Sequence, residues 1–379
     1  MVIENNYFSN FSLVEQFLCS AISFIPKDDT FELYEQIDDH IIFEAAKKND
    51  VDSIIGYRLI EKYGKDNIPP HWVNSYKSTN EKIAFYLEEL DKISSLFANE
   101  GIPLVALKNV GIARAIYNKT PACCPMGDID VLTEKKYYDN AQAILLKNGY
   151  NFKARNSMEM AYYKELPNGK SLWLELLVRT IDGRWVGSDQ EPKAEEVLLR
   201  AIPISGTTAK LLSPEDNLLQ VSLHTSKHTY VRAPGFRLHT DVDRIVNSSK
   251  INWNVFINRV KRHGVSTTVY FSLLIPTELF GTPIPADVLY QLSPKKCKKK
   301  LISAWLNKVG IFNPDESKFS KMGFIIFNIL LYDNFTVFIR NLFPTTKLMK
   351  ESYNFTFTLL LPYYYLLRII NLIFKRAKT

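Results

Sequence analysis

The sequence has few cysteines and none of the patterns that usually employ them. Its four cysteines lie at positions 19, 123, 124 and 297. No pair has the spacing of zinc ligands, and the adjacent Cys123 and Cys124 suit neither a disulfide scaffold nor a metal knuckle. These absences exclude a zinc-knuckle domain and a disulfide-rich secreted domain, so we expect a reducing, cytoplasmic environment.

Long apolar runs and targeting signals are also lacking. No stretch of 18 or more apolar residues occurs without interruption, so we expect no membrane-spanning helix. The segment from Met1 to Asn6 has neither the basic start nor the apolar centre of a signal peptide. The contents of glycine and proline are ordinary and no internal repeat is visible, which excludes a fibrous or disordered protein.

What the sequence does contain is enough apolar material for a large core. The chain has 379 residues, of which 46% are hydrophobic, and this length favours two or three domains. The formal net charge of +7 permits a phosphate-bearing partner without requiring one.

The pattern of apolar residues divides the chain into three regions. Residues 1–100 and 186–379 have helical spacing, whereas residues 101–185 alternate between predicted strands and helices. We therefore predict an α/β (α+β) protein in which a small mixed sheet forms the core, flanked by an N-terminal and a C-terminal helical region. In the flanking regions we predict helices at 11–25, 41–64, 80–99, 214–229, 238–247, 252–263, 266–280, 294–308 and 317–332.

The central region begins with the apolar run 103–107, which is typical of a buried strand. The segment 128–132 alternates polar and apolar residues, as a half-buried strand does. A hairpin is predicted at Asn168-Gly169, because this dipeptide favours tight turns. The remaining predicted elements of the core are helices at 109–117 and 134–148 and strands at about 158–166 and 170–178.

Two carboxylates in this region are candidate ligands of a divalent cation. Asp128 and Asp130 are two residues apart on a predicted strand, so their side chains project from the same face. Carboxylates so close together repel each other unless a cation lies between them. Mg²⁺ (or Mn²⁺) suits the pair because it takes oxygen ligands and shares them with substrate phosphates. The alternative to a cation site is that both aspartates are simply solvated at the end of a strand.

A third carboxylate lies in an otherwise apolar strand. Glu175 is surrounded by the run 172–178, where an ionised side chain is costly unless it is paired or binds a metal. We therefore predict that Asp128, Asp130 and Glu175 together hold one or two cations. The competing interpretation is an ion pair of Glu175 with Lys108 or Arg179.

These residues belong to a longer pattern. The segments 107–117 and 125–132 resemble the bacterial uncharacterised nucleotidyltransferase family, which belongs to the DNA polymerase beta-like nucleotidyltransferase superfamily. That family has a Leu-Lys-Gly turn, a short helix ending in tyrosine, a loop with an arginine, and an Asp-Ile-Asp strand. Downstream, 214–216 and 223–224 are similar to its Pro-Glu-Asp, Leu and His helix, and the resemblance covers residues 80–270.

The resemblance implies a reaction and a set of roles. A nucleoside triphosphate would be attacked at its α-phosphate by an acceptor oxygen of a sugar, a peptide, a protein or an RNA, with release of pyrophosphate. Asp128, Asp130 and Glu175 would bind the metal ions and act in catalysis, and Lys108 would steady the phosphates. Asn109 and Gly111 would complete the nucleotide-binding turn.

The sequence also departs from the family pattern. Asn109 stands where the family has a glycine, and Cys124 stands where its loop carries an arginine. Either Asp241 or Asp243 is similar to an aspartate of the next family helix. The altered positions leave open an alternative function: a catalytically impaired nucleotide-binding or scaffolding module of a biosynthetic pathway.

The segment 355–376 is the most membrane-like part of the chain. It is rich in apolar and aromatic residues and is interrupted by Pro362 and Arg368. We predict a terminal helix that packs onto the body of the protein. The alternative is a peripheral contact with a membrane interface.

Overall fold

The computed structural model describes residues 11–156, 159–166, 169–181, 187 and 190–371. Within these residues seven strands form one mixed sheet in the order β3-β4-β5-β2-β1-β7-β6. The pairs β2–β5 and β1–β7 are parallel, and the other neighbours are antiparallel. The strands are β1 (Val105–Ala106), β2 (Ile129–Leu132), β3 (Asn151–Asn156), β4 (Glu159–Glu165), β5 (Ser171–Leu177), β6 (Ile202–Pro203) and β7 (Lys210–Leu211).

The strand β2 lies in the middle of this sheet, between β5 and β1. We predicted a half-buried strand here, but all residues of β2 are buried, and Asp130 is only 5% exposed. The prediction was wrong because both faces of a central strand are covered, so the polar side chain at alternate positions is enclosed as well.

The predicted hairpin is present on one side of β2. β4 and β5 pair in antiparallel register, with Glu165 opposite Ser171. The turn closes through a hydrogen bond from the Leu166 amide to the Lys170 carbonyl at 2.8 Å. Gly169 has a φ of 75°, which L side chains rarely adopt, while Asn168 lies outside the described residues.

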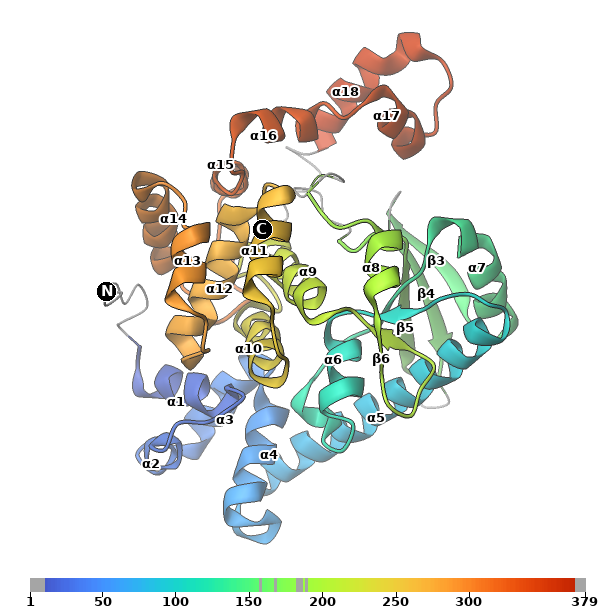
Figure 1. Cartoon of the computed structure of the whole chain (residues 1–379). Coiled ribbons are helices and arrows are strands. Elements are labelled where there is room, and N and C mark those ends of the chain that lie inside the picture. The colour runs from blue at the N-terminus through green and yellow to red at the C-terminus, as the bar shows by residue number, and fades with distance from the viewer. Residues whose placement is uncertain (1–10, 157–158, 167–168, 182–186, 188–189, 372–379) are drawn as a thin grey trace.

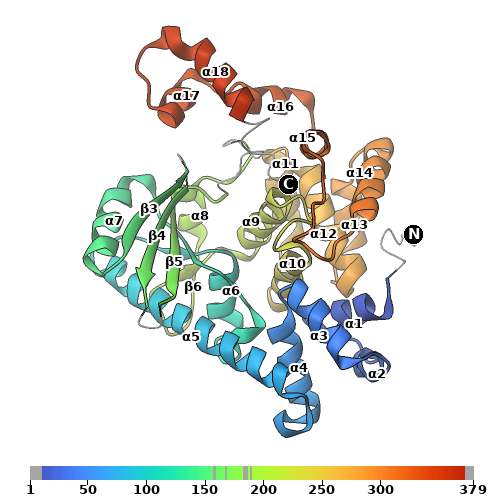
Figure 2. The same ribbon diagram turned by 180° about the vertical axis from the view of Figure 1, so that it is seen from behind.

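The helix α5 (Pro70–Asn99) connects the two halves of the molecule. It begins at Pro70, not at the predicted residue 80, because proline at the first helical position lacks only an amide that has no helical partner. It packs against α4 (Asp52–Tyr63) at one end and against α7 (Tyr138–Lys147) farther along. Figures 1 and 2 show α5 running from the N-terminal helices along the sheet.

The N-terminal region forms the helices α1 (Leu13–Ile22), α2 (Thr30–Glu35), α3 (Asp39–Lys48) and α4. The single helix predicted over 41–64 is divided into α3 and α4. Asp50, between them, has a φ of 54°, which lies outside the helical region and interrupts the helix.

After β5 the chain is again mostly helical, as predicted, but the strands β6 and β7, which were not predicted, interrupt this region. The helices are α8 (Ala194–Arg200), α9 (Pro214–Lys227), α10 (His239–Ser248), α11 (Trp253–Arg262), α12 (Ser266–Phe280), α13 (Ala286–Leu292), α14 (Lys296–Val309) and α15 (Lys321–Leu330). One continuous cluster of buried apolar side chains extends from Phe17 through Leu174 of the sheet to Leu331. The predicted α/β (α+β) class, with a small mixed sheet between two helical regions, is confirmed.

The two faces of the sheet have different coverings. Ile129, Val131 and Leu174 belong to the large core, whereas Leu132 and Leu177 contribute to a second cluster under α8. Because side chains alternate along a strand, Asp130 shares its face with Leu132, and Glu175 shares its face with Leu177. The two acidic residues therefore lie beside the smaller cluster and not in the main core.

The C-terminal helices stand apart from the rest of the molecule (red in Figure 1). They are α16 (Phe335–Leu342), α17 (Thr346–Tyr353), the short 3-10 helix η5 (Thr358–Leu360) and α18 (Leu361–Ile370). We predicted that 355–376 packs onto the body, but no residue of α18 is buried. The prediction is wrong for the described part of this segment, and residues 372–376 lie outside it. None of the described helices combines the length and apolar character that crossing a bilayer requires.

Candidate active site on the central strands

The acidic residues predicted from the sequence come together on neighbouring strands. β2 and β5 are parallel, and Asp130 is paired directly with Glu175. Directly paired residues project from the same face of a sheet, and adjacent strands lie only about 4.8 Å apart. Asp128 precedes Asp130 by two residues and is half-buried just before the strand begins. The register therefore places Asp130 and Glu175 on one face of the sheet, whereas Asp128 lies outside β2, and the register does not place its side chain.

Lys108 lies between two of these carboxylates. Its Nζ atom is 2.6 Å from Oδ1 of Asp130 and 3.9 Å from Oε2 of Glu175. The three side chains are between 7% and 15% exposed. The ion pair with Lys108, which we had weighed as the competing interpretation for Glu175, is thus present, whereas Arg179 pairs with Glu191 instead.

The backbone at Lys108 is unusual. Its φ is 51°, in the left-handed region, although it is the first residue of α6 (Lys108–Ile116). The preceding residue, Leu107, donates its amide hydrogen to the carbonyl of Asp130 at 3.0 Å. A non-glycine residue in this conformation stores strain, and such strain is concentrated at functional sites. The turn thus fixes the lysine directly beside β2.

The close charges change the protonation of this cluster. Burial, followed by the neighbouring Asp130, raises the pKa of Glu175 to about 7, although the positive charge of Lys108 opposes the shift. Burial lowers the pKa of Lys108, but Asp130 and then Glu175 raise it to a value above that of a free lysine. The lysine is therefore charged at neutral pH, and Glu175 is close to half-protonated.

No group of three or more His, Cys, Asp or Glu side chains converges as metal ligands in the described part of the chain. The ammonium of Lys108 occupies the space between Asp130 and Glu175 as an internal cation. The donor set is nevertheless the one that Mg²⁺ prefers, because it consists of carboxylate oxygens.

The loop that leads into Asp128 is anchored by three side chains. Arg237 donates to the carbonyl of Pro125, Lys82 donates to that of Met126 at 2.8 Å, and the Tyr86 hydroxyl donates to that of Gly127 at 3.3 Å. Lys82 and Tyr86 come from α5, whereas Arg237 precedes α10. Three consecutive carbonyl groups, from Pro125 to Gly127, are held in this way, and the positive charge of Lys82 acts on Asp128. None of the three anchoring residues was predicted from the sequence.

Cys124 is fully buried in the loop before β2, and its sulfur contacts a side chain of α10. Arg244 donates to the Cys124 sulfur at 3.6 Å and pairs with Asp241 at 3.0 Å, with both charged side chains 3% exposed. With its amide nitrogen toward Asp241, the side chain of Asn109 donates to both carboxylate oxygens at 2.8 and 3.1 Å. Asn109 and Cys124 are therefore joined through a buried polar network.

Gly111 allows α6 to approach the sheet closely. A Cβ atom at this position would lie 2.6 Å from the carbonyl oxygen of Ala106 and 2.8 Å from a methyl group of Leu211. Such distances are below van der Waals contact, so only glycine fits here. The residue predicted to belong to the nucleotide-binding turn thus sets the distance between that turn and the strands β1 and β7.

His224 and His228 lie on one face of α9, and their ring centroids are 4.9 Å apart. Burial lowers the pKa of His224 well below its usual value, and the positive charge of Lys108 contributes. Burial also lowers the pKa of His228 to about 3. Both rings are therefore neutral at physiological pH. The effect of Lys108 on their pKa values shows that the end of α9 lies near this lysine.

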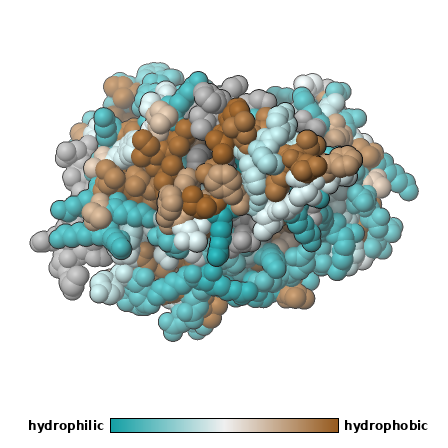
Figure 3. Space-filling view, turned by 90° about the horizontal axis from the view of Figure 1, so that it is seen from above, coloured by the Kyte–Doolittle hydropathy of each residue, from teal (hydrophilic) through white to brown (hydrophobic). Residues whose placement is uncertain are grey.

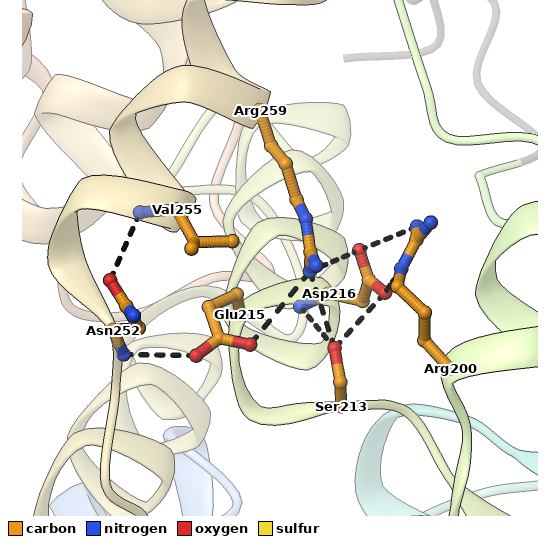
Figure 4. A network of polar contacts seen from close by, with 7 residues as sticks. All are labelled: Arg200, Ser213, Glu215, Asp216, Asn252, Val255 and Arg259. Atoms are coloured by element: carbon orange, nitrogen blue, oxygen red, sulfur yellow. Dashed lines mark hydrogen bonds and ion pairs between the residues drawn. The ribbon is translucent and has the colours of Figure 1, made fainter.

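The Pro-Glu-Asp sequence at the start of α9 forms a buried ionic network (Figure 4). The side chain of Asp216 is 0% exposed, accepts a hydrogen bond from Arg200 at 2.8 Å and forms an ion pair with Arg259 at 2.8 Å. Ser213 caps the helix through the Asp216 amide, and Glu215 pairs with Arg259 at 3.8 Å. The network joins α8, α9 and α11, and so holds α9 in place next to the sheet.

Comparison with known proteins shows the family to which the chain belongs. Residues 35–281, more than half of the chain, match the family described as "Uncharacterised nucleotidyltransferase", and the chain belongs to this family. Among solved structures it is similar to an antigenic nucleotidyltransferase-like protein from Paracoccidioides brasiliensis, with 12% identity and a TM-score of 0.34. That similarity covers 56% of this chain and 96% of the other. A search of curated proteins found no match.

Proposed function

We propose that this chain is a metal-dependent nucleotidyltransferase that moves a nucleoside monophosphate from a nucleoside triphosphate to an acceptor. The observation that supports this most strongly is the direct pairing of Asp130 with Glu175 on parallel strands, with Asp128 on the approach to the same face. All three lie inside the segment that matches the nucleotidyltransferase family. An acceptor oxygen would attack the α-phosphorus, and the bond to the departing pyrophosphate would break.

In this proposal Asp128, Asp130 and Glu175 hold Mg²⁺ or Mn²⁺. When bound, such ions lower the pKa of the attacking hydroxyl group and neutralise the charge of the triphosphate. Lys108, which pairs with Asp130 in the structure, would then pair with the phosphates instead. Glu175, with a pKa near 7, is suited to accept the proton of the acceptor hydroxyl.

The surroundings of the cluster provide further positive charge and a rigid support. Lys82 and Arg237 bring cations to the loop that leads into Asp128. Asn109, through Asp241, and Gly111, through its close contact with β1, would hold the nucleotide-binding turn that carries Lys108. Fixed groups of this kind aid phosphoryl chemistry because they need no rearrangement as charge develops.

The test of this function is nucleotide turnover by the full chain. Each of the four nucleoside triphosphates is incubated with the protein, Mg²⁺ and representative sugar, peptide, protein and RNA acceptors. We expect Mg²⁺-dependent release of pyrophosphate in amounts equal to the nucleotide that becomes attached. Release of inorganic phosphate without transfer, or no nucleotide binding in calorimetry, would contradict the proposal.

A second candidate is a nucleotide-binding or scaffolding module without turnover. The observation that favours it is the direct bond from Lys108 to Asp130, which neutralises a proposed metal ligand internally. The replacement of the family glycine and arginine by Asn109 and Cys124 points the same way. Tight nucleotide binding without release of pyrophosphate from the nucleotide in the presence of any tested acceptor would favour this module over the enzyme.

The pH dependence of metal binding provides a further prediction. Because the pKa of Glu175 is about 7, its carboxyl group is increasingly protonated below pH 7 and cannot act as a metal ligand. The affinity for Mn²⁺, measured by electron paramagnetic resonance, is expected to fall by up to about tenfold per pH unit below pH 6 and to level off above pH 8. Glu175→Gln should bind Mn²⁺ weakly and with a flatter profile from pH 6 to 8. An unchanged profile in this variant would exclude Glu175 as the titrating ligand.

A further inference from the structure

The C-terminal helices expose large apolar side chains to solvent. Leu359 is 94% exposed, Phe357 is 73% exposed and Phe335 is 70% exposed. Seen from above, apolar side chains gather on this side of the molecule (Figure 3). We define the C-terminal apolar face as Phe335, Ile339, Phe343, Phe357, Leu359, Tyr363, Leu366 and Ile370.

The exposed residues follow the helical period. Phe335 and Ile339 are four apart on α16, with Phe343 four residues farther on, and Tyr363, Leu366 and Ile370 recur at intervals of three and four on α18. Residues with this spacing form a stripe on one side of a helix, which normally packs against a core. Here neither α16 nor α18 has a buried residue. An uncovered apolar surface of this kind marks an interaction site.

The two helices are held together as one unit. The hydroxyl of Tyr365 donates to the carbonyl of Pro344 at 2.6 Å, and the guanidinium of Arg368 donates to the carbonyl of Asn341 at 2.9 Å. The rings of Phe355 and Tyr364 are stacked at 4.2 Å. These contacts use the polar and inner sides of α18 and leave its apolar stripe outward.

The charge of this region identifies the kind of partner. Lys321, Arg340 and Lys347 are exposed on α15, α16 and α17. Residues 321–371 contain five lysines and arginines but only two acidic residues, Asp333 and Glu351. The carboxylate of Asp333 accepts hydrogen bonds from the first amides of α12 at 2.7 Å. The apolar face therefore belongs to a segment with a net positive charge.

We propose that the C-terminal apolar face docks onto the surface of an anionic lipid bilayer. Apolar and aromatic side chains would enter the interface between headgroups and acyl chains, and the lysines and arginines would attract anionic headgroups. A second copy of this chain fits less well, because face-to-face association would bring two positively charged segments together. The proposal does not depend on nucleotidyl transfer.

Sedimentation of the full chain with lipid vesicles tests this proposal. Vesicles containing phosphatidylglycerol are expected to bind the protein at least tenfold more tightly than vesicles of phosphatidylcholine alone. Leu359→Asp should weaken binding to the anionic vesicles by at least tenfold, because it removes an exposed apolar side chain that would enter the bilayer and adds a negative charge. Arg340→Gln should weaken it about fivefold.

The matched control is Leu199→Asp. Leu199 lies on α8, is 88% exposed and is not part of the C-terminal apolar face, so this variant should bind vesicles as the unchanged protein does. Absence of vesicle binding, or equal loss in both leucine variants, would overturn the proposal. So would a dimer in light scattering that Leu359→Asp converts to monomer, because the second copy would then be the partner.

Discussion

Replacing Asp130 with asparagine is expected to lower the rate of nucleotidyl transfer on the order of a thousandfold. Asp130 is buried in the central strand β2 and is paired with Glu175, so a neutral amide here removes charge at the centre of the proposed metal site. A carboxylate ligand stabilises the metal ion and, through it, the charge that develops on the phosphates. The measurement is pyrophosphate release at saturating Mg²⁺, together with the affinity for nucleotide.

Asp130→Asn also removes the ion pair with Lys108, so the stability of the variant must be measured together with its activity. Lys108 loses its 2.6 Å partner but retains Glu175 at 3.9 Å, so its positive charge is not left without compensation. Thermal unfolding of the metal-free protein distinguishes loss of activity from loss of fold. Asp139→Asn, which removes an exposed acidic residue in the first turn of α7, is the control and should leave transfer unchanged. Transfer at the normal rate in a folded Asp130→Asn protein would contradict the assigned role.

The second large effect concerns stability. Asp216→Ala is expected to reduce the free energy of unfolding by about 2 to 4 kcal/mol, because it removes a fully buried carboxylate shared by two arginines, of which Arg259 retains Glu215 at 3.8 Å and Arg200 is 35% exposed. Asp216 is fully buried, and its carboxylate is shared by Arg200 and Arg259 (Figure 4). Removal of the carboxylate leaves both guanidinium groups without this partner and loosens the contact between α8, α9 and α11. Urea denaturation measures the change.

The control for this variant is Asp287→Ala. Asp287 also lies in the first turn of a helix, α13, but its side chain is exposed. We expect a loss below about 1 kcal/mol, since exposed charges near a helix N-terminus contribute little. Similar losses in the two variants would mean that Asp216 acts only through the helix dipole and not through its arginine partners.

The seven-residue helices α8 and α13 were not predicted, but the longer helices between residues 214 and 332 were, because they have strong local signals. α9, for example, begins with a capping serine, a proline and two acidic residues, and the structure starts the helix at Pro214. The two-residue strands β6 and β7 could not be recognised, because so short a segment has no period to detect. They exist because the edge of the sheet at β1 provides hydrogen-bonding partners.

The candidate site was predictable only in part. The alternation of Asp128 and Asp130 and the cost of burying Glu175 are properties of short segments, and both pointed to a shared acidic face. The left-handed backbone of Lys108 left no mark in the sequence. Lys82 and Arg237 were missed because they are distant in sequence from the loop that they anchor.

In the C-terminal region the sequence predicted the helix correctly but its burial incorrectly. An apolar, aromatic helix was expected to be buried, and the segment 361–370 is indeed helical. Whether such a helix is buried depends on the shape of the remaining surface, and no residue of α16 or α18 is fully buried. Composition alone therefore predicted the element but not its exposure.

The amino-acid sequence alone determined where most helices and strands form, the α/β class and the three acidic residues, because periodicity, helix capping and the cost of burying charge act over a few neighbouring residues. The tertiary structure decided that β2 and β5 are parallel with Asp130 opposite Glu175, and that Lys108 lies between them. Strand register and ion pairing join segments far apart in the chain, and their energies depend on distance and burial, which exist only once the chain has folded.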